Sequence, residues 1–346
     1  MNRRFRRGLV VGKFCPLHLG HEFLIGQARE NCDELIVLSY TEPGFPGYDS
    51  RRREVWLKTR FPDVIALALD NPRLAVLGRA AGIEHVPAIP ADDATDDVHR
   101  RFVAWFLDAV LGKRVDGVFT SEDYGEGFAE ILSQRFGHRV EHVCVDKARH
   151  TIPISGTRIR ADVHACRAYL SAEVHASFVR RICLLGGESS GKTTLAAALA
   201  ETLKTAWVAE YGRELWELKQ GRLQLADMLA IATTQIQHEE AAVRQARRFL
   251  VCDTSPLTTA FYSQAMFGQI EDELSRLADR AYDLTLLCAP DFEFVQDGTR
   301  RDHEFRMRQH QWYVDVLANK GVDYYVLQGA LEQRVAGAVS LLGMLR

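Results

Sequence analysis

A glycine-rich octapeptide near the middle of the 346-residue chain constrains the fold more than any other feature. It reads Gly186-Gly187-Glu188-Ser189-Ser190-Gly191-Lys192-Thr193 and fits the pattern G-x-x-x-x-G-K-[ST]. An apolar run at residues 182–185 precedes it, and a helix-length stretch at residues 192–203 follows it. This order predicts a strand, a loop whose backbone N–H groups surround a phosphate, and a helix. The second half of the chain should therefore form a parallel α/β domain.

The side chains of this loop suggest individual roles. Lys192 is expected to reach the β- and γ-phosphate oxygens of ATP, and Thr193 is expected to bind Mg²⁺. Backbone and hydroxyl groups of the loop and of the first helical turn would surround the phosphates. These further ATP-binding candidates are Gly187, Glu188, Ser189, Ser190, Gly191 and Thr194.

Three later segments are candidates to complete this site. An apolar strand ends at Asp253, which we expect near Mg²⁺ or the acceptor hydroxyl, although a helix-capping role is the alternative. Glu210 follows the predicted strand at residues 205–209 and is a candidate base for a ribose hydroxyl. Tyr211 and Arg213 are candidates to contact the acceptor. Residues 297–302 resemble a lid, in which Arg300 would neutralise the transferred phosphoryl group.

Short apolar runs alternate with longer amphipathic stretches along the whole chain, which is typical of parallel sheets covered on both faces. We predict two doubly wound α/β domains, a Rossmann-like one at residues 1–170 and a P-loop one at residues 171–346. The segment 167–180 contains no Pro or Gly and is predicted to be a connecting helix. The predicted strands are residues 9–11, 35–38, 115–119, 140–145, 182–185, 205–209, 249–252, 284–288 and 324–327. The predicted helices are residues 21–31, 51–60, 97–111, 125–136, 192–203, 224–247, 303–319 and 331–345.

A second chemical signal lies at the start of the chain, where a strand is followed by His18-Leu19-Gly20-His21. The N-terminus of the following helix offers free N–H groups and a positive dipole to phosphate. His18 and His21 can donate hydrogen bonds there, and Lys13 adds a mobile charge. Gly20 permits close approach of a phosphate, and Gly12 and Phe14 complete the ATP-binding candidates. A zinc site is the alternative for the two histidines.

The third signal is the segment Ile154-Ser155-Gly156-Thr157-Arg158-Ile159-Arg160. Ser155 and Thr157 are residues that commonly cap a helix, and their hydroxyls can also contact phosphate. Arg160 is expected to act as a bidentate donor from the first helical turn. Ordinary capping is the alternative for the two hydroxyls.

Composition limits the class of partner. Lys and Arg total 43 and Asp and Glu total 46, a balance that argues against a dedicated nucleic-acid binder. Seven scattered cysteines favour a reducing compartment. We find no apolar run long enough for a membrane span and expect a cytoplasmic protein.

The two N-terminal motifs resemble those of the nucleotidyltransferase superfamily, which includes nicotinamide-nucleotide adenylyltransferases and class I aminoacyl-tRNA synthetases. Joined to a P-loop kinase domain, they resemble the NadR family of bifunctional nicotinamide-nucleotide adenylyltransferases and ribosylnicotinamide kinases. The likeness also includes Ser121, Glu122, Val145 and Asp146. It implies that ATP and Mg²⁺ are used and that the substrates are nicotinamide riboside, nicotinamide mononucleotide (NMN), ATP and NAD.

The resemblance also suggests substrate contacts in residues 51–57, where Arg53 and Trp56 are candidates, and at Trp105. Either tryptophan would stack on nicotinamide, although a role in the core is the alternative. Some family members carry a helix-turn-helix domain, for which about seven residues before the first strand leave no room, so we expect no direct DNA repression. Two other functions stay open: the same chemistry on another phosphorylated metabolite, or a non-catalytic sensor of NAD or ATP. A homo-oligomer is possible on the sequence alone.

Overall fold

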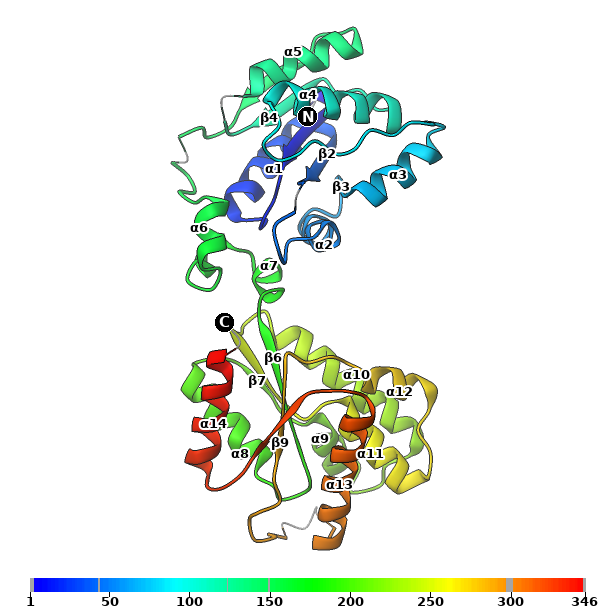
Figure 1. The fold of residues 1–346 in the computed structure, drawn as a ribbon, viewed down its shortest axis with the longest axis vertical. Coiled ribbons are helices and arrows are strands. Elements are labelled where there is room, and N and C mark those ends of the chain that lie inside the picture. The colour runs from blue at the N-terminus through cyan, green and yellow to red at the C-terminus, as the bar shows by residue number, and fades with distance from the viewer. Residues whose placement is uncertain (1–2, 43, 123, 149, 297–300, 345–346) are drawn as a thin grey trace. The chain divides into compact units, whose positions relative to one another are not determined.

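The computed structural model describes residues 3–42, 44–122, 124–148, 150–296 and 301–344. The chain forms two compact units, Met1–His175 and Ala176–Arg346, and each is described by itself (Figure 1). Each unit contains a five-stranded sheet in which every paired strand is parallel. The prediction of two parallel-sheet α/β domains is therefore confirmed.

The sheet of the N-terminal unit has the strand order β3-β2-β1-β4-β5. Its strands are β1 (Phe5–Gly12), β2 (Cys32–Tyr40), β3 (Ile65–Leu69), β4 (Gly117–Thr120) and β5 (Glu141–Cys144). The chain moves outward from β1 to β3 and then returns to the other side of β1 at β4. At such a point the loops after two neighbouring strands diverge, which opens a crevice at their carboxyl ends.

Helices cover both faces of this sheet, as right-handed crossovers require when the direction of winding reverses. The helices are α1 (Leu19–Asn31), α2 (Ser50–Arg60), α3 (Asn71–Ala80), α4 (Asp96–Trp105), α5 (Gly125–Phe136), α6 (Gly156–Ala161) and α7 (Ala172–Ala176). A π-helical turn, Phe106–Val110, extends α4, and a 3₁₀ turn, Arg167–Tyr169, precedes α7.

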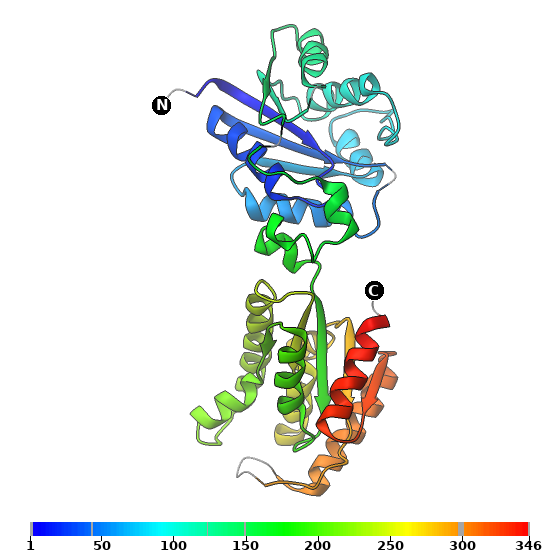
Figure 2. The same ribbon diagram turned by 90° about the vertical axis from the view of Figure 1, so that its left-hand side faces the viewer.

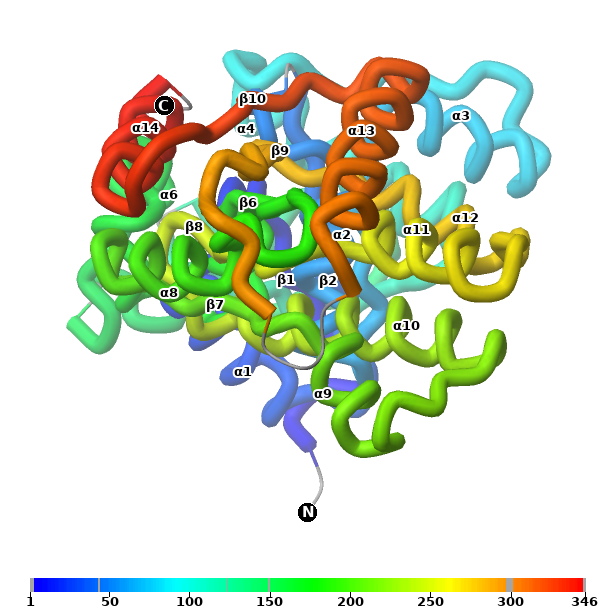
Figure 3. The backbone as a smooth tube through the Cα atoms, turned by 90° about the horizontal axis from the view of Figure 1, so that it is seen from below, coloured from blue at the N-terminus to red at the C-terminus, as the bar shows by residue number. Residues whose placement is uncertain are grey.

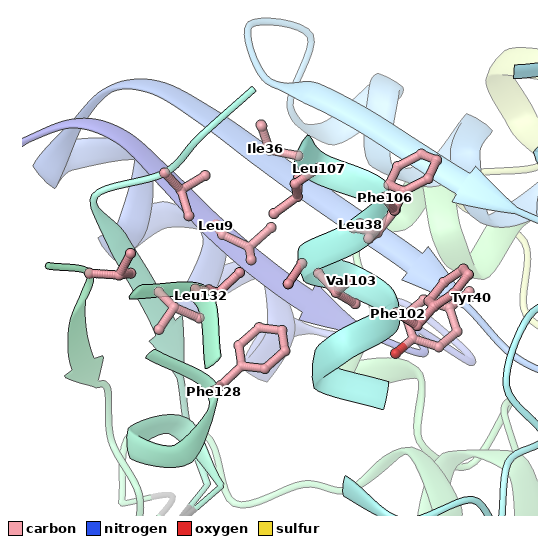
Figure 4. Close-up of a cluster of buried hydrophobic side chains, with 14 of the residues drawn as sticks. Leu9, Ile36, Leu38, Tyr40, Phe102, Val103, Phe106, Leu107, Phe128 and Leu132 are labelled. Carbon is pink, nitrogen blue, oxygen red and sulfur yellow. The ribbon is translucent and has the colours of Figure 1, made fainter. Parts of the chain in front are cut away.

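A hydrophobic core of the N-terminal unit lies between the sheet and helices α4 and α5 (Figure 4). Leu9, Ile36 and Leu38 project from the strands, and aromatic and aliphatic side chains of the helices pack onto them. The helical side chains labelled in the figure are Phe102, Val103, Phe106, Leu107, Phe128 and Leu132. Burial of this apolar face holds α4 and α5 over the carboxyl end of the sheet.

Replacing Leu107 by alanine should lower the free energy of unfolding of the N-terminal unit by about 2–5 kcal/mol. Leu107 is fully buried, so its removal leaves a cavity in the core. Chemical denaturation measures the change. Val98→Ala is the matched control, because Val98 lies on α4, which the turn of Leu107 extends, with 47% of its surface exposed. It should change stability by less than about 0.5 kcal/mol. Equal losses in both variants would contradict this placement of the core.

The sheet of the C-terminal unit has the order β10-β9-β6-β8-β7. Its strands are β6 (Arg180–Gly186), β7 (Trp207–Val208), β8 (Phe249–Asp253), β9 (Leu284–Cys288) and β10 (Tyr324–Leu327). Its helices are α8 (Lys192–Leu203), α9 (Tyr211–Leu218), α10 (Leu225–Ala242), α11 (Pro256–Phe267), α12 (Asp272–Ala278), α13 (His303–Asn319) and α14 (Leu331–Met344).

Successive residues of β6 alternate between two cores. Ile182 and Leu184 pack with α8 and α14, which lie side by side in Figure 2. Cys183 and Leu185 pack with α11 and α13 on the opposite face. Figure 3 shows α8 and α14 on one side of β6 and α13 on the other. The strand is buried on both faces, which explains why its sequence is apolar without alternation.

Several details differ from the sequence predictions. The segment 167–180 is not one connecting helix but the turn Arg167–Tyr169, the short helix α7 and the start of β6. The predictions missed β3 and α3, as well as α9, α11 and α12. Within the described residues, no helix has both the length and the apolar character that crossing a membrane requires.

Candidate functional sites

A cavity of about 530 Å³ lies at the carboxyl ends of the strands in the N-terminal unit. Its walls come from the loops after β1, β4 and β5 and from α1, α4 and α6. The candidates Gly12, Lys13, Phe14, His18, Gly20, His21, Ser155, Thr157 and Arg160 all line it. The histidine motif and the segment 154–160, which are distant in the sequence, therefore share one cavity.

The two histidines begin helix α1, two residues earlier than the sequence suggested. Nδ1 of His18 accepts a hydrogen bond from the backbone N–H of His21 at 3.3 Å, and the two rings stack with centroids 3.6 Å apart. Because Nδ1 acts as the acceptor, the neutral ring of His18 carries its proton on Nε2. That nitrogen can donate to an anion at the helix N-terminus.

Gly20 is required by this stacking. A Cβ atom at position 20 would lie 3.1 Å from two atoms of the His18 ring, which is tighter than ordinary van der Waals contact. Glycine at this position therefore lets the capping histidine keep its place beside His21.

Arg160 joins the third motif to the loop after β1. Its Nη1 donates to the carbonyl oxygen of Cys15 at 2.8 Å, and its Nη2 donates to Oγ1 of Thr157 at 3.0 Å. Ser155 caps α6 by accepting from the N–H of Arg158. Since α6 is short, Arg160 lies in its last turn rather than in the first turn that we expected.

Lys13 also has a defined partner, because its Nζ lies 3.0 Å from Oδ2 of Asp92. Its backbone carbonyl oxygen accepts from Nη1 of Arg53 at 3.2 Å, and that guanidinium also donates to Oγ of Ser39 at 2.9 Å. Arg53 is almost fully buried and does not line the cavity. Its hydrogen bond to the carbonyl oxygen therefore stabilises the backbone of the loop that contains Lys13.

The two tryptophan candidates are not in the cavity. Trp56 is only 2% exposed, and Trp105 packs against the hydrophobic core beside Phe102, with ring centroids 5.9 Å apart. Stacking of either indole on a substrate ring does not fit these positions. Helix α2 packs against strands β2 and β3 of the sheet, and Trp56 is buried in the protein interior rather than in the cavity wall.

Sequence reasoning missed much of the wall formed by α4. The hydroxyl of Tyr40 lies 3.2 Å from Nδ1 of His99. Arg100 donates to the carbonyl oxygen of Tyr124 at 3.1 Å and to Asp96 at 3.0 Å. Burial raises the pKa of Tyr124 to about 12, so its hydroxyl stays protonated. No motif marks these residues; only the helical spacing of 96, 99 and 100 could have suggested a shared face.

The C-terminal unit places the glycine-rich octapeptide between β6 and α8, as the sequence indicated. Gly191 adopts a left-handed conformation with φ of 78°, and a Cβ at Gly187 would lie 2.6 Å from the carbonyl oxygen of Arg306. Nζ of Lys192 donates to the carbonyl oxygens of Gly186 at 2.9 Å and Gly187 at 3.1 Å. The ammonium group therefore lies over the loop.

Thr193 and Asp253 lie together at the end of β8. Oγ1 of Thr193 donates to Oδ2 of Asp253 at 2.6 Å. Oδ1 of Asp253 is buried and has no hydrogen-bond partner in the described part of the chain. An orphaned carboxylate oxygen beside a hydroxyl offers the hard oxygen ligands that Mg²⁺ prefers. Elsewhere in the described ranges, no three His, Cys, Asp or Glu side chains gather as a metal site, so the zinc alternative for His18 and His21 has no support.

The Asp253→Asn variant should be more stable than the original chain at neutral pH. Burial raises the pKa of Asp253, with Lys192 opposing the shift, so the folded state holds the proton more tightly than the unfolded chain. Ionisation therefore costs folding free energy as the pH rises above the ordinary carboxyl range, and asparagine removes that cost. The difference in melting temperature should shrink as the pH falls towards 4. Asp323→Asn, at an exposed position, is the control and should show no such trend. A destabilised Asp253→Asn variant at pH 8 would contradict the argument.

A second cavity, of about 130 Å³, adjoins the loop in this unit. Glu188, Glu210 and Arg213 line it, as does Arg301. Burial raises the pKa of Glu210, with Lys192 opposing the shift. The wall also contains residues that sequence reasoning missed: Trp216, Leu223, Met228, Ile231, Gln235, Thr254, Thr258, Thr259, Tyr262 and Met266. They follow no motif and lie on α9, α10 and α11 and in the loops that precede α10 and α11.

Three candidates lie elsewhere. The backbone N–H of Tyr211 donates to Oε1 of Gln235 at 2.9 Å, and its ring meets His238, so it is not part of the cavity wall. Thr194 is exposed on α8. Arg300, together with residues 297–299 of the expected lid, lies outside the described residues.

Comparisons with known proteins agree with this two-unit architecture. Residues 181–334 match the family model of an AAA domain. The trifunctional NAD biosynthesis/regulator protein NadR of Escherichia coli (strain K12) is 31% identical over 304 residues, which cover 85% of this chain and 71% of that protein. This chain belongs to the NadR family. The protein of the same name from Salmonella typhimurium (strain LT2) is also 31% identical, with the same coverage.

Solved NadR structures share the fold. A crystal structure of a NadR protein in complex with NAD and AMP-PNP superimposes with a TM-score of 0.65 at 19% identity and covers 98% of this chain and 95% of that one. A NadR structure in complex with NR gives a TM-score of 0.63 at 21% identity and covers 93% of this chain and 90% of that one. At these identities the likeness concerns the fold.

Proposed function

We propose that this NadR-family chain carries out two successive reactions of NAD biosynthesis. The C-terminal unit would phosphorylate the 5′-hydroxyl of nicotinamide riboside with ATP. The N-terminal unit would transfer the adenylyl group of a second ATP to NMN, giving NAD and pyrophosphate. The observation that supports the proposal is that each unit has its own candidate phosphate-binding groups beside its own cavity. In the N-terminal unit, His18, His21 and Arg160 line the cavity. In the C-terminal unit, the loop that contains Lys192 adjoins the cavity through Glu188.

In the N-terminal unit, no side chain needs to act as a nucleophile. The phosphate of NMN would attack the α-phosphorus of ATP, and pyrophosphate would leave. His18 and His21 at the N-terminus of α1, with Arg160 and Lys13, would bind the triphosphate as charge moves onto the leaving pyrophosphate. Thr157 and Ser155 would add hydroxyl contacts. Catalysis then rests on positioning and on electrostatic stabilisation.

In the C-terminal unit, Lys192 and the loop N–H groups would bind the β- and γ-phosphates of ATP. Glu210 would accept the proton of the acceptor hydroxyl. The raised pKa of Glu210 suits this role, because it makes the carboxylate a stronger base than an ordinary carboxylate. Arg213 and Arg301 would contact the acceptor or the transferred group from the cavity wall.

The Mg²⁺ that accompanies ATP would be held by Oγ1 of Thr193 and the carboxylate of Asp253, whose geometry fits two oxygen ligands. When bound, the ion supplies charge neutralisation on the phosphates. Two protein ligands are sufficient, since Mg²⁺ usually keeps several water molecules.

The choice of nicotinamide substrates rests on the family and on the ligands named for the two solved NadR structures, NAD with AMP-PNP and NR. The functional assignment of residues 1–170 and 171–346, with the compact units dividing at His175, is part of this proposal.

The test is incubation with nicotinamide riboside, ATP and Mg²⁺, followed by mass detection of products. The proposal expects NMN first and then NAD with pyrophosphate. A parallel panel replaces NMN with a sugar phosphate or a pantetheine phosphate. Pyrophosphate release with one of these and none with NMN would assign the chemistry to another metabolite. Binding of ATP without turnover of any acceptor would instead indicate a sensor.

A further inference from the structure

Glu188 is an acidic residue in a loop that is proposed to hold phosphates, and its carboxylate is held away from that role. Oε1 of Glu188 accepts a hydrogen bond from the hydroxyl of Tyr262 at 2.9 Å. Oε2 accepts one from the backbone N–H of Arg301 at 2.8 Å. Both carboxylate oxygens therefore have donors, and the two donors come from separate parts of the chain.

These two partners both belong to the smaller cavity. Tyr262 lies on α11 and Arg301 lies just before α13, and both line the cavity together with Glu188 itself. Burial raises the pKa of Tyr262, so its hydroxyl remains protonated and acts as the donor at neutral pH. The carboxylate thus joins the phosphate loop to two walls of the neighbouring cavity.

The backbone of Glu188 is fixed as well. Its N–H donates to Oε1 of Gln309 at 2.9 Å, and Gln309 is almost fully buried on α13. A movement of the Glu188 side chain can therefore reach the rest of the unit only through its hydrogen bonds. The side-chain contacts to Tyr262 and Arg301 are the ones that reach the cavity.

The negative charge of Glu188 determines which way its carboxylate moves when a polyphosphate binds in the loop. A polyphosphate in the loop repels the carboxylate of Glu188, and this repulsion is strong where water is excluded. The carboxylate is then pressed towards its two donors rather than towards the loop. Occupancy of the loop should therefore strengthen the hydrogen bonds to Tyr262 and Arg301 and order the cavity wall that they form.

We propose that Glu188 is a positioning residue that couples nucleotide binding in the loop to the shape of the acceptor cavity. This inference rests on the proposed kinase function of the C-terminal unit. Binding of ATP and of the acceptor should then be mutually favourable, because a coupling between two sites acts equally in both directions. Glu188 itself need not touch the acceptor.

Two substitutions disable the coupling from opposite ends. Glu188→Gln removes the negative charge that a polyphosphate would repel. Its amide can still pair with the Arg301 N–H and with the Tyr262 hydroxyl, which can accept as well as donate, so this variant tests the charge. Tyr262→Phe removes the hydroxyl and keeps the charge of Glu188. Glu201→Gln is the control for loss of a negative charge, because Glu201 is exposed near the end of α8 and does not line the cavity.

The first measurement is hydrogen exchange of the full chain with and without a non-hydrolysable ATP analogue, which requires no acceptor. The original chain and Glu201→Gln should show analogue-dependent protection in α11 and in residues 301–305. Glu188→Gln and Tyr262→Phe should bind the analogue and lack this protection. Protection that persists in Glu188→Gln, or that is missing from the original chain when the analogue is bound, would overturn the coupling.

The second measurement is the affinity for nicotinamide riboside with and without the analogue. The original chain should show a gain of about fivefold or more, and the two variants should show almost none. The double variant should lose no more than either single one, since both act on the same coupling between the loop and the cavity. A purely structural role would lower the melting temperature and leave the gain intact. Failure of the original chain to bind this nucleoside would count against the proposed function alone, because the exchange measurement decides the coupling independently.

Discussion

Replacing Lys192 by alanine should abolish phosphorylation of nicotinamide riboside and leave adenylyl transfer to NMN intact. Lys192 carries the only side-chain cation of the phosphate loop and lies over the carbonyl oxygens of Gly186 and Gly187. Its removal takes a charged donor from the place where charge builds up on the transferred phosphate, which costs about 10²–10³-fold in turnover at comparable sites. The N-terminal cavity belongs to the other compact unit and should be unaffected.

Two assays on the same preparation measure this effect: NMN formed from nicotinamide riboside, and NAD formed from supplied NMN. Lys320→Ala is a suitable control, because Lys320 is exposed at the end of α13 and lies outside the cavity wall. Loss of both activities in folded Lys192→Ala protein would contradict two separate sites. Retention of full kinase turnover would contradict the role of the loop.

The opposite pattern is expected for His18→Ala, which should lose adenylyl transfer by about 10²–10³-fold and keep kinase turnover. The change removes an imidazole that lines the cavity of the proposed triphosphate site. It also removes the cap of α1, because Nδ1 of His18 accepts from the N–H of His21. Loss of a cap alone destabilises a helix by roughly 0.5–2 kcal/mol.

His18→Asn separates these two effects. Asparagine is a good capping residue, so this variant should keep the stability of α1 while still lacking the imidazole donor. Denaturation measures stability, and pyrophosphate release measures the reaction. If His18→Asn transfers adenylyl groups as fast as the original chain, His18 serves only as a cap. If His18→Ala also loses kinase turnover without unfolding, the two reactions share a site.

Much of the fold was open to prediction because its signals are local. Apolar runs of four or five residues, such as 182–185 and 284–288, are long enough to identify buried strands. The strand β3 (Ile65–Leu69) lies between Pro62 and Pro72, and its mixture of alanine and leucine is as compatible with helix as with strand. Its identity depends on pairing with β2, which no local pattern records.

The candidate sites divide in the same way. The histidine motif and the glycine-rich octapeptide were located correctly in their strand-to-helix turns, since consecutive residues specify the backbone geometry that they require. The substrate-facing side chains were harder. Trp56 resembled a stacking residue, yet α2 turns it into the core, whereas Trp216 lines the smaller cavity and carried no signal.

From the sequence alone it followed that the chain contains two parallel α/β units and two separate strand-to-helix turns with motifs typical of phosphate binding, because each of these is specified by residues close together in the chain. Only the tertiary structure decided which other distant residues meet: Arg160 with the loop at Cys15, and Glu188 with Tyr262. Those contacts depend on the order of strands in each sheet and on the face that each helix covers. Both are set by burial summed over the whole unit, so no short segment of the sequence specifies them.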